Sequence, residues 1–92
     1  MFVVSITYTA PADEIAAQRP GHIDWLQAAF ARGNMQIAGS KSTRDGGILL
    51  TTHPDRPTLE AELNQDPYRT HDVATHSIVE FEATMTRHGS DS

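Results

Sequence analysis

The sequence contains no cysteine. Disulfide bonds, thiolate catalysis and cysteine-ligated zinc or iron–sulfur sites are therefore excluded. Long apolar runs are also missing, since none approaches the roughly 20 residues that span a bilayer. The apolar start, residues 1–6, lacks the basic residues of a signal peptide and is typical of a first strand. We expect a soluble, cytoplasmic protein.

Basic residues are scarce. Seven Lys and Arg face twelve Asp and Glu, which gives a formal net charge of −5. This balance provides no electrostatic footprint for nucleic acid or for an anionic membrane. The expected partners are therefore a small-molecule ligand and further copies of the chain.

The chain has 92 residues, 38% of them hydrophobic. This length fits one globular domain, and a core this thin is often completed by oligomerisation. We expect one domain over residues 1–86 and a flexible polar tail over residues 87–92.

The spacing of apolar residues predicts an alternating order of strands and helices. Strands are indicated by period-two alternation, helices by apolar residues three and four apart, and the breaks by Gly and Pro. Pro20 must lie in the first turn of its helix or mark a break within it. The expected strands are 2–8, 35–40, 48–52 and 75–85, the expected helices are about 13–32 and 58–65, Asp45-Gly46-Gly47 is a hairpin turn, and 67–74 is an irregular turn.

This β-α-β-β-α-β order predicts an α+β, ferredoxin-like fold, with both helices on one face of a four-stranded antiparallel sheet. The other face is expected to be half apolar, and a second copy is the simplest cover for it, so a homodimer is predicted. Its expected members are Val3, Ser5, Thr7, Ile78, Glu80 and Glu82, with Val79 and Phe81 turned toward the helices.

Several local motifs resemble the YCII-related (YciI-like) family. They are Arg19-x-x-His22 with Leu26 one turn later, Gly33 closing the helix, Gly39 ending the second strand, the Asp45-Gly46-Gly47 turn and Asp66-Pro67-Tyr68. The resemblance implies a ferredoxin-like fold of the dimeric α/β-barrel superfamily, with His22 and Asp66 paired in a cleft between helices and sheet. Ser40 and the segment 69–72 depart from the family pattern, which leaves the substrate open.

His22 and Asp66 are the predicted catalytic residues. A histidine can serve as general acid or base when a carboxylate fixes its tautomer. Simpler roles exist for both residues: His22 can be a boundary histidine bonded to a carbonyl, and Asp66 can N-cap the turn after it. We expect the two side chains to lie within hydrogen-bond reach, directly or through one water.

Trp25, Ser40 and Tyr68 are the predicted substrate-binding residues. No cofactor is expected, because the sequence has no Gly-rich dinucleotide turn and no helical His pair. No metal site is expected either: His53, His71, His76 and Asp72 lie in loops and strand starts, which favours surface histidines.

Three function classes remain open. The first is a cofactor-free enzyme that uses His22 and Asp66 for acid/base chemistry on a small metabolite, of the lyase, isomerase or dehalogenase type. The second is a cofactor-free monooxygenase, which rests on fold analogy alone. The third is a non-catalytic dimer that binds a metabolite or a protein.

Overall fold

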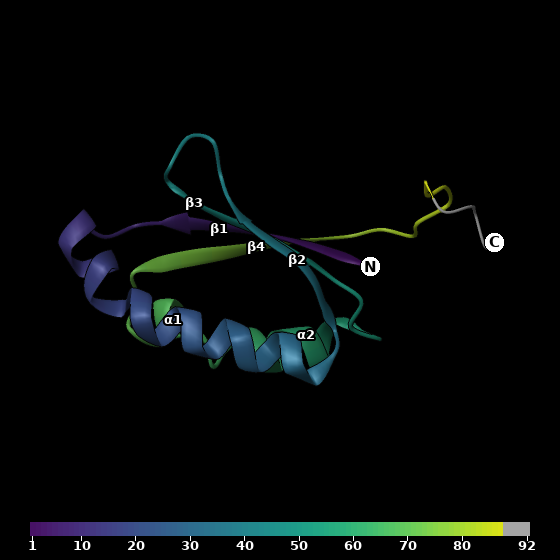
Figure 1. Ribbon diagram of the computed structural model, residues 1–92, viewed down its shortest axis with the longest axis horizontal. Coiled ribbons are helices and arrows are strands. Elements are labelled where there is room, and N and C mark those ends of the chain that lie inside the picture. The colour runs from purple at the N-terminus through teal and green to yellow at the C-terminus, as the bar shows by residue number, and fades with distance from the viewer. Residues whose placement is uncertain (88–92) are drawn as a thin grey trace.

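The computed structural model describes residues 1–87 and confirms the α+β fold (Figure 1). Residues 88–92, most of the expected flexible tail, lie outside the described part of the chain. The elements in chain order are β1 (Phe2–Tyr8), α1 (Ala12–Arg32), β2 (Met35–Ser40), β3 (Gly46–Thr51), α2 (Arg56–Leu63), α3 (Pro67–Thr70) and β4 (Ala74–Glu80).

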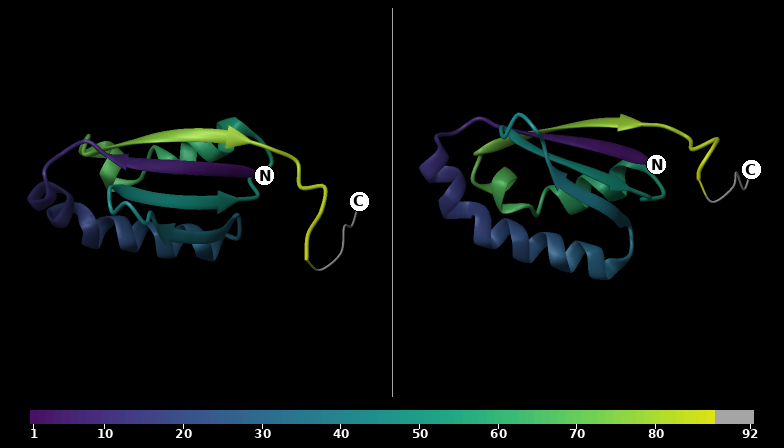
Figure 2. Two further views of the ribbon diagram at one scale, coloured as in Figure 1. Left: turned by 90° about the horizontal axis from the view of Figure 1, so that it is seen from above. Right: turned by 45° about the horizontal axis from the view of Figure 1, so that its top comes forward.

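The four strands form one antiparallel sheet in the order β2-β3-β1-β4, and the helices cover one face of it (Figures 1 and 2). The first strand is therefore central, with β3 on one side and β4 on the other. Among residues 1–87, no helix is long and apolar enough to cross a membrane.

The core lies between the sheet and the helices. Phe2, Val4 and Ile6, from alternate positions of β1, are each no more than 2% exposed. Leu59 and Leu63, one turn apart on α2, are fully buried against the sheet side of the molecule. Full burial of one such side chain stabilises the fold by about 1.5–3 kcal/mol. The buried face of β1, with every second residue inside, therefore packs in the same core as the buried face of α2, with residues four apart inside.

The first helix is long, and Pro20 lies inside it. It ends where the sequence indicated, since Gly33 adopts a left-handed conformation (φ 102°) and its N–H donates to the Phe30 carbonyl. This helix carries His22 and Trp25 toward the sheet, where both are buried.

A close approach fixes the start of β3. Gly46 pairs with Thr7, and a Cβ at Gly46 would lie only 1.7 Å from the carbonyl oxygen of Ile6. Only glycine fits this contact. The expected turn at Asp45-Gly46-Gly47 was misplaced, because Gly46 and Gly47 belong to β3 and the connection from β2 to β3 spans residues 41–45.

The last strand is shorter than the expected 75–85. Its partner β1 pairs Phe2 with Glu80, and the final ladder bond joins the Phe81 N–H to the Met1 carbonyl. The pairing with β1 ends at this point. Residues 82–85 form no strand, despite their alternating pattern.

The face assignment of β4 was also wrong. Ile78 pairs with Val4 and Glu80 with Phe2, which places Ile78 and Glu80 on the helix side of the sheet, whereas Glu82 lies beyond the strand. Val79 pairs with Val3 and is 59% exposed on the open face. A one-residue change of register reverses every side chain of a strand, and both faces of β4 are of mixed polarity.

The segment after β3 differs from the prediction in two respects, since the helix expected at about 58–65 spans Arg56–Leu63 and a further short helix follows it. Asp55 caps α2 by accepting from the Thr58 N–H at 2.9 Å. Residues 67–74, expected as an irregular turn, contain the short helix α3, and Asp66 caps it by accepting from the Tyr68 N–H at 3.0 Å. The capping role foreseen for Asp66 is therefore present.

Candidate functional site

His22 and Asp66 meet as expected. The Nδ1 atom of His22 lies 2.7 Å from Oδ1 of Asp66, and both residues are buried. The contact depends on how closely α1 and α3 pack: a Cβ at Gly21 would lie 3.2 Å from Cγ of Pro67. A carboxylate can only accept, so Nδ1 carries the proton and Nε2 is left as the second functional nitrogen of the ring.

A second histidine shares the same carboxylate. His76 Nε2 lies 3.0 Å from Oδ2 of Asp66, and both side chains are fully buried. His76 comes from β4, so Asp66 joins α1, the α2–α3 segment and the sheet. Nδ1 of His76 is buried and has no hydrogen-bond partner among the described residues. The site is therefore a His22–Asp66–His76 cluster, one residue larger than expected.

Two opposing effects act on the pKa of Asp66. Burial raises it, whereas the hydrogen bonds from His22, His76 and the Tyr68 N–H lower it. The net result is a pKa below the ordinary 3.8. Asp66 is therefore an anion at neutral pH, and this charge would stabilise an imidazolium at His22.

The aromatic ring of Tyr68 covers one face of the His22 ring. The two rings stack with centroids 4.0 Å apart and planes inclined by 8°. Tyr68 also contacts Tyr8 edge to face, with centroids 5.7 Å apart. Arg19 lies beside both tyrosines, whose hydroxyl groups raise the pKa of its guanidinium. The imidazole of His22 is thus held by a carboxylate at one edge and an aromatic ring on one face.

A cavity of about 560 Å³ opens beside this cluster. Its size is in the range of small-molecule pockets. Its apolar wall comes from α1 and the sheet, and its polar groups come from α1, the β2–β3 hairpin and Tyr68. The polar lining consists of Tyr8, Arg19, His22, Ser40, Arg44 and Tyr68.

The predicted substrate-binding residues fall into two groups. Ser40 and Tyr68 both line the cavity with His22. Trp25 does not belong to this lining: its indole N–H donates to the Glu62 carbonyl at 3.1 Å. The side chain of Trp25 extends from α1 to α2, and the centroid of its ring lies 5.7 Å from that of His22. Trp25 therefore contacts His22 without lining the cavity.

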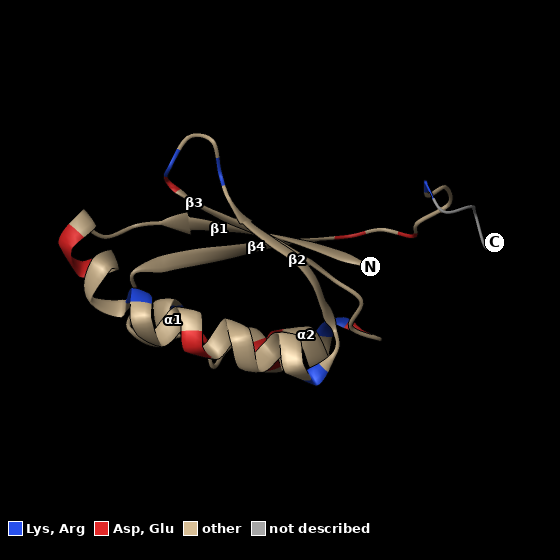
Figure 3. Cartoon of the chain, viewed as in Figure 1, with Lys and Arg blue, Asp and Glu red and all other residues tan. Residues whose placement is uncertain are grey.

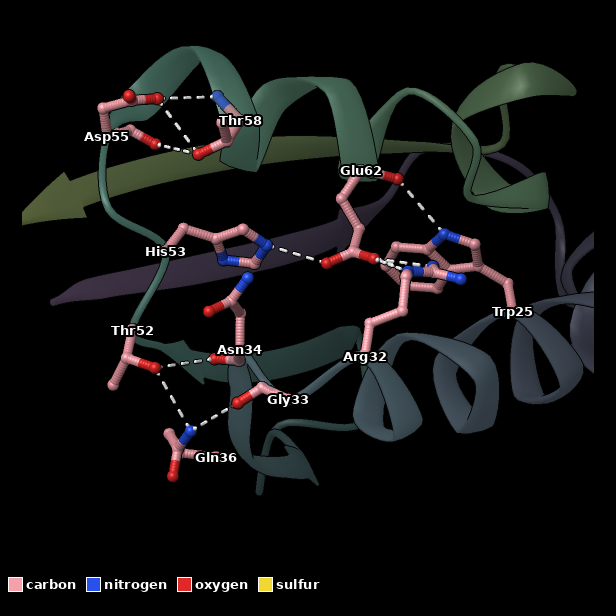
Figure 4. A network of polar contacts seen from close by, with 10 residues as sticks. All are labelled: Trp25, Arg32, Gly33, Asn34, Gln36, Thr52, His53, Asp55, Thr58 and Glu62. Carbon is pink, nitrogen blue, oxygen red and sulfur yellow. Dashed lines mark hydrogen bonds and ion pairs between the residues drawn. The ribbon is translucent and has the colours of Figure 1, made fainter.

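A second histidine–carboxylate pair joins the loop after β3 to α2 (Figure 4). His53 Nε2 is 2.7 Å from Oε1 of Glu62, whose Oε2 pairs with Arg32 at 2.6 Å. Figure 4 shows Glu62 reaching down from α2 between His53 and Arg32. This network ties the end of α1 to α2 and to the loop after β3.

The prediction of surface histidines was therefore wrong for two of the three. His53 and His76 are buried and paired with carboxylates, whereas His71 is exposed. Within residues 1–87, no group of three or more His, Asp or Glu side chains is arranged to hold a metal ion.

The sequence signal for His76 depends on the face assigned to Ile78. It lies two residues before Ile78, and correct placement of Ile78 on the helix side puts His76 there too. A histidine on a buried strand face needs a polar partner, and Asp66 was the available carboxylate. His53 has no comparable signal, because it lies in the loop after β3, where no alternating strand pattern assigns it to a face.

Comparisons with known proteins agree with this fold. The YCII-related domain matches residues 1–82. No curated protein matched the chain. Among solved structures, 5-chloro-2-hydroxyhydroquinone dehydrochlorinase of Burkholderia phenoliruptrix AC1100, in complex with 2,5-dihydroxybenzoquinone, is similar with a TM-score of 0.71 and 13% identity, over 98% of this chain and 100% of the other. The match over residues 1–82 shows that the chain belongs to the YCII-related family.

Proposed function

We propose that the protein is a cofactor-free enzyme that transfers a proton to or from a small metabolite through Nε2 of His22. The observation that carries the proposal is the 2.7 Å contact between His22 Nδ1 and a buried Asp66, at the wall of a cavity. This contact sets the tautomer that leaves Nε2 able to accept a proton. The burial of both residues strengthens the interaction, because attraction between charges is stronger away from water.

The reaction class that suits this site is an elimination or an isomerisation. In an elimination, Nε2 of His22 takes a proton from a carbon atom, the C–H electrons form a double bond, and the leaving group departs with its bonding pair. Asp66 then balances the charge of the imidazolium. The dehydrochlorinase with the same fold supports this choice, although the low identity makes the likeness one of fold.

The experiment compares the wild type with His22→Asn. The asparagine amide can still donate to Asp66, so the fold is retained while the basic nitrogen is lost. His71→Asn makes the same chemical change at an exposed histidine and is the matched control. A panel of halogenated hydroquinones, enols and small organic acids would be followed by chloride release and mass spectrometry, with and without oxygen.

We expect turnover by wild type and His71→Asn, independent of oxygen, and a loss of about 100-fold or more in His22→Asn. Equal turnover by all three proteins would overturn the role of His22. Turnover that requires oxygen would assign the chain to the monooxygenase class. Binding of panel compounds without turnover would leave a non-catalytic metabolite-binding protein.

We also propose that the protein is a cytoplasmic homodimer built on the open face of the sheet. One register row crosses all four strands there and consists of Ile37, Leu50, Val3 and Val79. Ile37 is 61% and Val79 59% exposed, so the row offers a continuous apolar stripe. Light scattering that finds a stable 10.1 kDa monomer at micromolar concentration would overturn the dimer.

A further inference from the structure

The Asp, Glu, Lys and Arg residues among the described lining of the cavity beside His22 are all arginines. Arg19 and Arg44 contribute to its wall, and no Asp or Glu among residues 1–87 does. This is the opposite of the molecule as a whole, whose formal net charge is −5. A local surplus of positive charge in an acidic protein favours an anionic ligand at that place.

Within the described part of the chain these two arginines form no ion pair, unlike three other arginines. Arg32, Arg56 and Arg69 each lie within 4.0 Å of a glutamate carboxylate. In residues 1–87, neither Arg19 nor Arg44 has a carboxylate partner. The neighbours of Arg19 are the hydroxyl groups of Tyr8 and Tyr68. Both charges are therefore free to meet a ligand.

The two arginines come from opposite walls. Arg19 lies on α1, three residues before His22, so the two side chains share one helix face. Arg44 lies on the β2–β3 hairpin, and basic segments on that hairpin and on α1 are visible in Figure 3. The neighbouring acid, Asp45, accepts from the Thr43 hydroxyl and does not line the cavity.

We infer that this cavity selects small organic anions, either carboxylates or ionised enols and phenols, through Arg19 and Arg44. The inference builds on the proposed function, because it names the class of substrate brought to His22. The anionic group lies between the two guanidinium groups, and the apolar wall of Leu26 and Leu49 holds the carbon skeleton. Arginine suits this task because its planar donors match carboxylate and enolate oxygens.

Two pairs of probes separate the sources of negative charge. Benzoate and benzamide differ in a carboxylate, and 2,5-dihydroxybenzoquinone and its dimethyl ether differ in ionised enol groups. Dissociation constants would be measured by calorimetry at about 20 mM and about 500 mM salt, because salt screens attraction between charges. For at least one of the two probe pairs, we expect the anion to bind at least tenfold more tightly than its neutral partner at low salt.

Three charge-removing variants test the residues. Arg19→Gln keeps a donor toward the two tyrosines. Arg44→Asn suits the backbone, because Arg44 has a positive φ of 66° and asparagine tolerates that region. Arg69→Gln removes the same charge outside the cavity and serves as control. We expect Arg19→Gln and Arg44→Asn each to weaken anion binding about tenfold, and Arg69→Gln to leave it unchanged.

The inference is overturned if neither anion binds more tightly than its neutral partner. It is also overturned if Arg69→Gln weakens binding as much as the two cavity variants, provided that all melt as the wild type does. His22→Asn separates this inference from the proposed function. Anion binding that is retained in His22→Asn, in a protein with no turnover, would support the binding site and remove the catalytic role.

Discussion

The imidazole of His22 lies flat against the phenol ring of Tyr68, with centroids 4.0 Å apart and planes inclined by 8°. The same carboxylate, that of Asp66, accepts from His22 and from the backbone N–H of Tyr68. One buried acid therefore places both rings, and the orientation of the histidine is coupled to the start of α3.

Changes at Tyr68 should separate the role of the ring from that of the hydroxyl. Tyr68→Phe keeps the stacked ring and should change the free energy of unfolding by less than about 1.5 kcal/mol. Tyr68→Leu removes the aromatic face from a residue that is 2% exposed, and should cost about 2–4 kcal/mol. Urea denaturation of the three proteins tests this, and equal stability of Phe and Leu variants would contradict the stacking role.

Asp66 should make stability depend on pH. Its pKa in the folded protein is lower than 3.8, so its ionised form stabilises the fold above that value. This contribution is lost as the pH falls through the lowered folded pKa. Asp66→Asn cannot ionise, so the stability gap between wild type and variant should be constant at neutral pH and shrink below about pH 3.8. Denaturation curves between neutral pH and pH 3 measure the gap, and a gap that widens in acid would refute the assignment.

His76 should act through its Nε2 donor. In His76→Gln the side-chain amide nitrogen can replace Nε2 and keep the bond to Asp66, whereas His76→Leu leaves Oδ2 of a buried carboxylate without its donor. We expect His76→Leu to lose about 1–3 kcal/mol more stability than His76→Gln. If the two variants unfold at the same denaturant concentration, the His76 contact contributes nothing measurable.

Gly46 should tolerate no side chain. Gly46→Ala places a Cβ 1.7 Å from the Ile6 carbonyl oxygen, so β1 and β3 must separate locally. The cost should reach about 3 kcal/mol or more. Gly39→Ala is the control, because a Cβ there meets nothing within 4 Å. Melting temperatures measured side by side test the contrast, and a Gly46→Ala protein as stable as the control would contradict this packing.

The sequence predicted most of the fold because strand and helix periods differ clearly along it. Phe2, Val4 and Ile6 alternate as a strand with one buried face requires, and they are the centre of the core. The meeting of His22 and Asp66 also followed from the sequence, since the motifs resembled those of a family and the two helices had to lie on one face.

The errors came from the last strand. Val79 and Phe81 look as suitable for a core as Ile78 does, and local pattern alone cannot decide between the two faces. The choice is made by pairing with β1, in which Val4 lies opposite Ile78 and Val3 opposite Val79. That pairing joins residues more than 70 positions apart, so it is a property of the whole sheet. His76 was missed for the same reason.

The two walls of the cavity differ in how readily they tolerate amino-acid substitution. His22, Asp66 and His76 belong to buried parts of two layers, whereas Arg44 belongs to an exposed hairpin. Only the two ends of its connecting segment, residues 41–45, bond to β1, through the Lys41 ammonium on the Thr7 hydroxyl and the Asp45 carbonyl on the Tyr8 N–H. Loops at the surface accept substitution far more readily than packed elements do. Natural drift or a directed library confined to residues 42–44 would therefore move the chain toward new ligands while the proton-transfer machinery and the melting temperature stay as they are.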